Sequence, residues 1–378
     1  MDDDSDDQVG APTQTRCATK QKRGPGKLLG LQVGRGVAAL LVVCCHATLS
    51  AQAFYGEAFG GFWSFGNIGV DFFFVLSGFI IYYAHHSDGV GLSSWSRYAK
   101  KRIIRIYSPF LPVSLVMLAA YALATGLSHG SREIGVIPSI LLIPTGRSPA
   151  LSPAWTLMHE MLFYTVFSLW FYSRRAFFRF SVLWTIGIFA YAFVPGDHAT
   201  MNFLLNPHNS EFVVGMVISW LVAKGYRGNL SALLFGVISV AVYAVASYLV
   251  DIDQLFGSSM LEVLYLGTAF GLVVWGLCGV EAVWKVRFPS ALIFLGAASY
   301  SVYLVHDPAI SLLSRVAALV RQSYAVPNDV LFLVVVCGAT LAGVLYHLIW
   351  EKPVLRFLTK VIVKSAAPKW PSGGGGQS

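Results

Sequence analysis

The sequence has little charge for its length, because Asp, Glu, Lys and Arg together make up only 12% of its 378 residues. Soluble globular proteins carry about twice that fraction, and 56% of this chain is hydrophobic. The composition therefore excludes an ordinary soluble protein and predicts a membrane protein with several spans. The net charge of +8 does not indicate nucleic-acid binding, since the basic residues lie in short clusters between apolar stretches.

Cysteine is also scarce, with five residues and no CxxC pair. Four of the five lie in apolar segments, where cysteine packs as a small reduced side chain. The pair His159-Glu160 lacks the second histidine of an HExxH zinc motif, because Phe163 occupies that position. The sequence thus predicts no disulfide framework, no metal site and no permanently bound cofactor.

The N-terminal region shows no cleavable signal peptide, because the first apolar stretch begins only at Leu28 and is too long for a signal-peptide core. Residues 1–27 begin with an acidic run, end with a basic cluster and contain almost nothing apolar, so we expect a disordered cytoplasmic tail. We expect a membrane domain over residues 28–353 and a second cytoplasmic tail over residues 354–378.

Ten apolar stretches have a length suited to crossing a bilayer, so we predict an all-α bundle of about ten transmembrane helices. The predicted cytoplasmic segments hold most of the 27 Lys and Arg residues, which follows the positive-inside rule and predicts that both termini are cytoplasmic. The short, proline-bounded apolar segment 134–145 is placed on the outer surface. The predicted spans are roughly residues 28–50, 62–84, 103–127, 154–173, 177–195, 210–224, 230–250, 260–280, 290–314 and 330–350.

The first span carries two polar residues that need an explanation, Arg35 and His46. They are eleven residues apart, which on a helix places both on one side, about 16 Å apart along the axis. An arginine inside a membrane helix costs roughly 2.5–3.5 kcal/mol on insertion scales. Arg35 could bind a phosphate or polarise a carbonyl, and His46 could act as a general base. The structural alternatives are snorkelling of Arg35 to the interface and hydrogen bonding of His46 within the bundle.

Later spans carry further polar residues. Asp71 begins the second span, where it could orient a histidine, bind sugar hydroxyls or cap the helix. Glu160 and Tyr164 are one helical turn apart and could share a site, since a carboxylate in a membrane span must be paired, protonated or functional. His306 in the ninth span has the same alternatives as His46, and Pro308 permits a kink beside it.

Residues 92–108 form a basic amphipathic stretch with interspersed aromatic residues, which we place on the cytoplasmic surface. Arg102 and Arg105 are three residues apart and share a helix face. They could therefore hold the phosphates of a nucleotide-bearing donor. Attraction to anionic lipid headgroups is the alternative.

Five groups of these residues, in this order, resemble the integral-membrane acyltransferase family 3, which includes O-antigen and exopolysaccharide O-acetyltransferases. The resemblance runs from about Leu28 to Pro353. The chain departs from the family at Gly34, where a bulkier apolar residue is usual, and in its acidic N-terminal tail. The five groups are Arg35 with His46; Gly69-Val70-Asp71-Phe72-Phe73 with Ser77-Gly78-Phe79; Arg102 and Arg105 beside Tyr107 and Pro109; Trp155-Thr156-Leu157 with Glu160 and Phe163-Tyr164; and Ser299-Tyr300-Ser301 with Tyr303-Leu304-Val305-His306.

The resemblance implies an O-acyltransferase that moves an acyl group, acetyl in our interpretation, from cytoplasmic acyl-CoA to a sugar hydroxyl of a cell-surface or exported glycan. The implied partners are acyl-CoA as co-substrate, a glycan or lipid-linked oligosaccharide, and membrane lipids, with no nucleic acid. The implied location is the bacterial cytoplasmic membrane. The alternative function is a glycan or lipid transporter without acyl-transfer chemistry, whose midplane charges would bind cargo.

The resemblance also implies roles by position. Arg35 and His46 would be the catalytic pair, and Arg102 and Arg105 would bind acyl-CoA. We expect a polar cavity lined by the first, second, fourth and ninth spans, with direct attack of the acceptor hydroxyl on the thioester; a covalent acyl-histidine is the other route. The remaining expected site residues are Glu160 and His306 as catalytic members, and Asp71, Trp155, Tyr164 and Tyr303 as acceptor-binding or supporting residues.

Overall fold

The computed structural model describes residues 28–123, 133–194, 198–250, 256, 259–284 and 286–363. Within these ranges the chain is helical apart from turns, loops and one isolated bridge between Ile134 and Ser148. The predicted all-α class is therefore confirmed. The predicted tail over residues 1–27 lies outside the described residues, as do residues 364–378 of the second predicted tail.

Seven helical segments in the described part of the chain are long and apolar enough to cross a membrane. The last of them runs without interruption through α14 (Asn328–Tyr346), η2 (His347–Glu351), α15 (Lys352–Leu358) and into η3 (Thr359–Val363). Helical structure thus continues into residues that the sequence assigned to a C-terminal tail. The other six are α1 (Leu29–Phe54), η1 with α2 (Phe59–Ile68 and Gly69–His85), α3 (Leu92–Leu123), α10 (Leu230–Leu249), α12 (Ser259–Trp284) and α13 (Ser290–Ser323).

Three of the ten predicted spans correspond to helices outside this set of seven. The predicted span 154–173 is divided between α5 (Ala154–Phe167) and α6 (Leu169–Tyr172). The predicted spans 177–195 and 210–224 correspond to α7 (Arg174–Tyr191) and α9 (Asn209–Ala223). α5 and α9 have only 14 and 15 residues. At 1.5 Å per residue each is about 22 Å long, which is less than a hydrocarbon core of about 30 Å. Seven of the ten predicted spans therefore match helices that are long and apolar enough to cross a membrane, and the predicted count of about ten is not confirmed.

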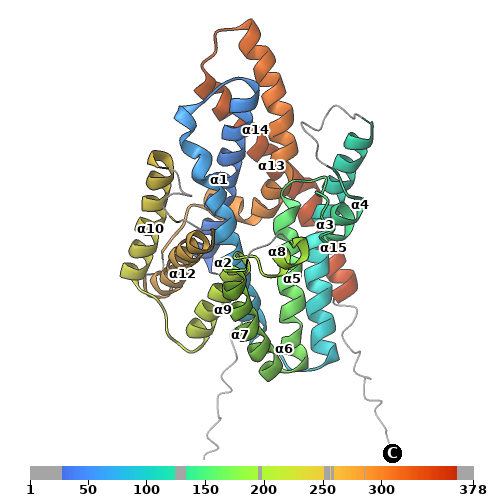
Figure 1. The fold of residues 1–378 in the computed structure, drawn as a ribbon, viewed down its shortest axis with the longest axis vertical. Helices are drawn as coiled ribbons and strands as arrows, with labels where there is room; N and C mark the ends of the chain where they lie inside the picture. Colours follow the sequence, from blue (N-terminus) through green and yellow to red (C-terminus); the bar gives the residue numbers. More distant parts are fainter. Residues whose placement is uncertain are drawn as a thin grey trace, which may run out of the picture.

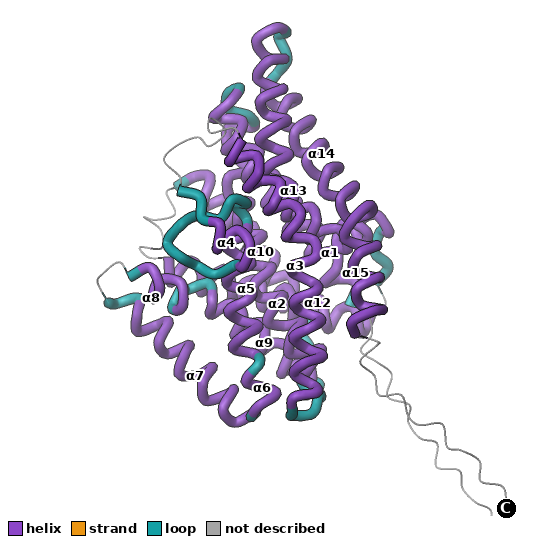
Figure 2. Tube along the Cα trace, turned by 90° about the vertical axis from the view of Figure 1, so that its right-hand side faces the viewer, coloured by secondary structure: helices purple, strands orange, loops and turns teal. Residues whose placement is uncertain are grey.

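The long helices surround a centre formed by α1 and α2 (Figure 1). α13 and α14 lie together at one end of the molecule, α10 and α12 on one flank, and α3, α5 and α15 on the other. The short helices α4 (Val136–Leu141) and α8 (Ala199–Leu204) and the loops beside them lie on one side of the bundle in Figure 2. α1 packs mainly against α13, and α2 mainly against α9.

The contact between α1 and α13 is close enough to involve the two backbones. A Cβ atom at Gly296 would lie 1.8 Å from the carbonyl oxygen of Gln32, so only glycine fits there. The start of α1 is held by a second helix, because Glu281 of α12 accepts hydrogen bonds from the backbone N–H groups of Leu29 and Gly30 at 2.7 and 3.0 Å. This carboxylate satisfies amides that a helix N-terminus leaves free, and it fixes the position of Arg35 two turns later.

Candidate active site

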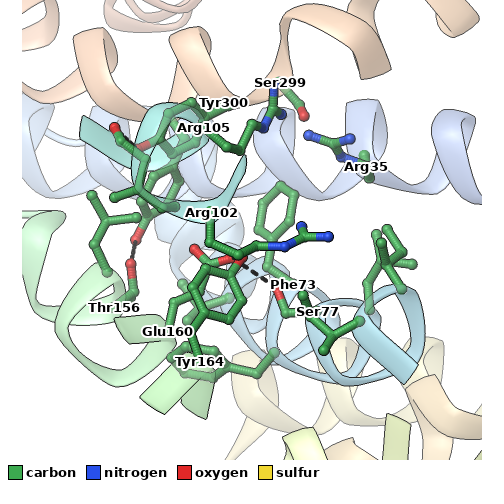
Figure 3. A pocket seen from close by; sticks show the side chains of 18 residues that line it. Arg35, Phe73, Ser77, Arg102, Arg105, Thr156, Glu160, Tyr164, Ser299 and Tyr300 are labelled. Atoms are coloured by element: carbon green, nitrogen blue, oxygen red, sulfur yellow. Dashed lines mark hydrogen bonds between the residues drawn. The ribbon is translucent and has the colours of Figure 1, made fainter. Parts of the chain in front are cut away.

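A cavity of about 160 Å³ lies between α1, α2, α3, α5 and α13 (Figure 3). The sequence predicted the contribution of the first, second, fourth and ninth spans, and the structure adds α3. Three arginines face one glutamate in this lining, with hydroxyl groups around them. The polar residues of the lining are Arg35, Ser77, Arg102, Arg105, Thr156, Glu160, Tyr164, Ser299, Tyr300 and Tyr303.

The basic stretch at 92–108 is part of one continuous helix, α3, that runs on through Pro109 and Pro112. This differs from the expected surface segment followed by a separate span. Because the helix does not end before residue 103, Arg102 and Arg105 enter the bundle and line the cavity. The position of both side chains favours binding of a ligand in the cavity over contact with lipid headgroups.

Glu160 and Tyr164 share one site, as their spacing on a helix predicted. The hydroxyls of Ser77 and Tyr164 both donate hydrogen bonds to Oε1 of Glu160, the former at 3.2 Å. The guanidinium of Arg102 lies 5.6 Å from the centroid of the Tyr164 ring. The only acidic side chain in the lining is therefore held by two hydroxyls on α2 and α5, close to an arginine of α3.

Arg102 is oriented by His85 at the end of α2. Its Nη2 lies 3.1 Å from Nε2 of His85, and Nδ1 of His85 lies 2.8 Å from Oδ2 of Asp88. Because a guanidinium has no acceptor, Nε2 of His85 must accept the hydrogen bond, and Nδ1 must carry the proton that is donated to Asp88. Asp88 therefore selects the tautomer of His85 that can hold Arg102.

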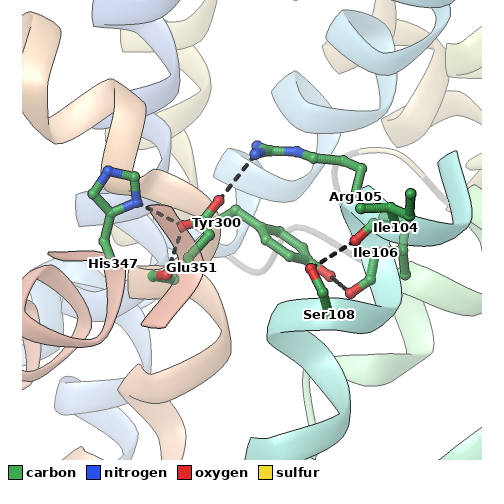
Figure 4. A network of polar contacts seen from close by, with 8 residues as sticks. Ile104, Arg105, Ile106, Ser108, Tyr300, His347 and Glu351 are labelled. Atoms are coloured by element: carbon green, nitrogen blue, oxygen red, sulfur yellow. Dashed lines mark hydrogen bonds and ion pairs between the residues drawn. The ribbon is translucent and has the colours of Figure 1, made fainter. Parts of the chain in front are cut away.

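Arg105 is oriented by a fully buried carboxylate, Glu351 (Figure 4). Nη1 of Arg105 donates to Oε1 of Glu351 at 2.9 Å, while Oε2 accepts from Ser301 at 2.6 Å and from Nδ1 of His347 at 2.7 Å. Glu351 lies in the π-helical turn η2, and such turns inside long helices are frequent at functional sites. Sequence analysis missed Glu351 and His347. The available signal was a carboxylate directly after the last apolar run.

His46 and His306 lie together but outside the cavity lining. Their ring centroids are 4.9 Å apart at an interplanar angle of 70°. Nδ1 of His46 lies 4.0 Å from Oδ1 of Asp307. Nδ1 of His306 donates to the carbonyl of Tyr303 at 2.6 Å, and its Nε2 is buried with no hydrogen-bond partner among the described residues. The two predicted catalytic histidines therefore form a pair, with one ring nitrogen left as an acceptor.

Tyr303 connects the cavity to the histidine pair, and Phe73 packs against it. Their ring centroids are 5.9 Å apart, and both residues line the cavity. The Tyr303 ring also lies 5.6 Å from that of His306, and its hydroxyl lies 2.9 Å from Oγ1 of Thr156. Arg35 lines the cavity, and His46 lies three turns further along α1, about 16 Å away along the helix axis.

The remaining predicted residues, Asp71 and Trp155, lie outside this lining. Asp71 is in the first turn of α2, and its Oδ1 is 3.4 Å from Nδ1 of His208, in the loop before α9. The Trp155 ring is 5.8 Å from the His208 ring. Of the three roles considered for Asp71, its place beside His208 favours the orientation of a histidine.

His208 and Glu211 were both missed by sequence analysis, although Glu211 lies within an apolar stretch and so carried the same signal as Glu160. Nδ1 of His208 lies 3.1 Å from Oε2 of Glu211. Burial by itself lowers the pKa of His208, but the negative charges of Asp71 and Glu211 and the contact with Glu211 outweigh burial and raise it to about 10. His208 therefore sits where a positive charge is strongly favoured.

Comparisons with known proteins agree with the geometry. Residues 28–349 match the family described as "Acyltransferase domain". The chain is 31% identical over 326 residues to the exopolysaccharide production protein ExoZ of Rhizobium meliloti, covering 79% of this chain and 93% of that protein. It is 26% identical over 371 residues to the acyltransferase MdmB of Streptomyces mycarofaciens, covering 88% and 93%. No solved structure matches the chain significantly.

The family match begins at the residue before α1 and extends into η2, so it includes every helix that lines the cavity. The match to MdmB also covers most of both chains. The resemblance seen in the five groups of residues is therefore confirmed over most of the sequence. The chain belongs to the acyltransferase family 3, and it is an integral-membrane O-acyltransferase.

Proposed function

We propose that the protein transfers an acyl group, acetyl in the simplest case, from cytoplasmic acyl-CoA to a sugar hydroxyl of a cell-surface or exported glycan, in the bacterial cytoplasmic membrane. The choice of acyl-CoA as the donor rests on one observation. Arg35, Arg102 and Arg105 converge on one cavity inside the bundle, with Glu160 as the acidic residue in its lining. Arginines suit the phosphates of a coenzyme A ester, because a guanidinium offers several donors in a fixed plane.

The partners of the arginines support separate roles along the donor. Glu351 balances the charge of Arg105, whereas His85 holds Arg102 as an uncharged acceptor. The hydrogen-bond partner of Arg102 therefore does not neutralise its charge, which suits Arg102 to an anionic ligand. Arg35 lies far from His46 on α1, which favours phosphate binding over polarisation of the thioester carbonyl among its two expected roles. The pantetheine arm would then extend past Phe73 and Tyr303 toward the histidine pair.

The chemical step is assigned to the histidine pair. The acceptor hydroxyl attacks the thioester carbonyl carbon, the C–O bond forms, the C–S bond breaks, and CoA leaves as the thiol. His46 takes the hydroxyl proton and returns it to the leaving sulfur. Asp307 lies nearest Nδ1 of His46, which favours the tautomer whose Nε2 is free to accept that proton. In this direct route no acyl-histidine forms.

The acceptor is the least constrained partner. The curated relative ExoZ is described as an exopolysaccharide production protein, which supports a glycan acceptor for this chain. The exposed ring of Trp155 beside the loop before α9 suits stacking against a sugar. A transporter without acyl-transfer chemistry is disfavoured by the match to an acyltransferase family. It is also disfavoured by the relative MdmB, which is named an acyltransferase and is covered by this chain over 93% of its length.

The test is transfer of label from radiolabelled acetyl-CoA to glycan in membrane vesicles, with wild type and His46→Ala at matched protein levels. Removal of the general base is expected to lower the rate by about 10²–10⁴-fold. His198→Ala, in an exposed position before α8, is the matched control and should transfer normally. Equal transfer by purified His46→Ala would refute the assignment of the base. Absence of transfer from acetyl-CoA and longer acyl-CoAs by wild type would refute the donor.

A further inference from the structure

Three buried or half-buried side chains outside the cavity meet at one point between α2 and α9. Asp71 comes from the first turn of α2, and His208 and Glu211 come from the start of α9, where they lie three residues apart on one face. One donor atom of each lies within 4.8 Å of the other two. The acyl-transfer mechanism uses none of them, so their convergence needs a separate explanation.

We propose that Asp71, His208 and Glu211 form a binding site for one divalent metal ion, such as Zn²⁺ or Mn²⁺. Nδ1 of His208 lies 3.4 Å from Oδ1 of Asp71 and 3.1 Å from Oε2 of Glu211. Neighbouring ligands of one ion at 2.0–2.2 Å are about 3.0–3.4 Å apart when the angle between them is about 90–110°. The separations therefore fit ligands around a shared ion, and one nitrogen with two carboxylates is a donor set that these metals accept.

Two buried carboxylate oxygens of the cluster lack a hydrogen-bond partner in the part of the chain that the structure describes. Asp71 Oδ1, the atom that faces His208, and Glu211 Oε1 are buried and have no hydrogen-bond partner among the described residues. Asp71 is 4% exposed and Glu211 is fully buried. Two ionised carboxylates exceed the charge of one protonated imidazole, so the buried cluster would keep a net negative charge, which is costly. A divalent ion balances that charge and supplies the missing partners.

The packing around the cluster indicates a structural role for the ion. α2 and α9 touch through their backbones, since a Cβ at Gly78 would lie 2.0 Å from the carbonyl oxygen of Phe212, and a Cβ at Gly215 would lie 1.9 Å from that of Val75. An ion at the start of both helices would tie together the ends of this contact. Phe74, three residues after Asp71, contacts the His208 ring and also lines the cavity. The ion would thus hold one wall of the cavity in place.

Metal content of the purified full-length protein is the decisive measurement. Protein stripped with a chelator and reloaded with Zn²⁺ or Mn²⁺ should retain about one equivalent of one of these ions after desalting, as measured by elemental analysis. Glu211→Gln and Asp71→Asn keep the side-chain volume but remove a charged ligand, and each should retain at least tenfold less metal. Glu133→Gln, which alters a largely exposed carboxylate, is the matched control and should bind metal like wild type.

A second readout separates a metal site from a cluster that holds only a proton. The added ion should raise the thermal unfolding midpoint of the wild type and of Glu133→Gln, but not that of Glu211→Gln, because an ion that binds the folded state stabilises it. This comparison needs no enzymatic activity, so it is independent of the proposed donor and acceptor. Wild-type protein that binds neither ion, or variants that retain as much as wild type, would overturn the proposal and leave a protonated His208 between two carboxylates.

Discussion

Arg102 and Arg105 lie three residues apart on α3 and line the same cavity, yet they have different partners. Arg105 is paired with a fully buried carboxylate, whereas Arg102 donates to a histidine that must be neutral to accept. Removing Arg105 leaves Glu351 buried with Ser301 and His347 as its remaining partners. Removing Arg102 leaves the uncharged ring of His85 without the hydrogen-bond donor to its Nε2. The same substitution therefore has different consequences at the two positions.

We expect Arg105→Ala to lower the free energy of unfolding by about 1–3 kcal/mol more than Arg102→Ala does, because it leaves a buried carboxylate without its counter-ion. Both variants should raise the KM for acyl-CoA. Thermal unfolding in detergent and initial rates at varied acyl-CoA measure the two effects separately. A double variant, Arg105→Ala with Glu351→Gln, should recover part of the stability but not the KM. Equal stability of the two single variants would contradict the pairing.

At the scale of elements, the site depends on how closely α1 and α13 approach. α1 carries Arg35 and His46, and α13 carries Tyr300, Tyr303 and His306, so the contact between these helices sets the distances in both parts of the site. Gly296 makes the contact possible because no side chain fits between its Cα and the backbone of α1. The family match covers both helices but says nothing about their separation.

Gly296→Ala should therefore push α1 and α13 apart, since its Cβ meets a backbone carbonyl that cannot rotate away. We expect a loss of about 1–3 kcal/mol in the free energy of unfolding from overpacking, together with at least tenfold slower transfer, because small displacements of positioned groups lower the rate steeply. Gly187→Ala in α7 is the control, because its Cβ would meet only the Leu205 side chain at 3.4 Å. Gly187→Ala should keep full activity; full activity in Gly296→Ala would exclude the close contact as a requirement.

At the scale of the whole molecule, the two parts of the site lie at different depths along α1. The cavity that holds the arginines and Glu160 meets α1 at Arg35, in the first half of the helix, and His46 lies about three turns further on. α13 has 34 residues, so it extends for about 51 Å, well beyond a hydrocarbon core of about 30 Å. This arrangement suits a donor that enters from one side and an acceptor that is reached from the other.

The orientation implied by this arrangement is testable with single cysteines. Ser93→Cys at the start of α3 should react with an impermeant thiol reagent only from the cytoplasmic side, and Ser323→Cys at the end of α13 only from the outer side. Both positions are exposed, and the five native cysteines are replaced in the background so that each variant carries one cysteine. The physical reason is the excess of Lys and Arg near the start of α3, which the positive-inside rule keeps in the cytoplasm. Labelling of both cysteines from one side would exclude this topology.

The sequence by itself determined the membrane class, the helical fold and the family. Apolar stretches of spanning length require helices, because a lipid environment leaves backbone groups no other partners. Charged residues inside such stretches, including Arg35 and Glu160, can be recognised from the sequence alone. The free-energy cost of a charge in a membrane span depends on its own position in that span. The helical spacing also placed Glu160 and Tyr164 in one site.

Only the tertiary structure decided which polar residues meet. The pairs Arg105–Glu351 and Asp71–His208 are separated by more than a hundred residues, and neither has a periodic signal because each contact depends on packing between helices. The contact between the His46 and His306 rings likewise depends on packing between α1 and α13. The span count shows a related ambiguity: the apolar residues of α5 are largely buried in the bundle, and burial requires the same residue types as contact with lipid.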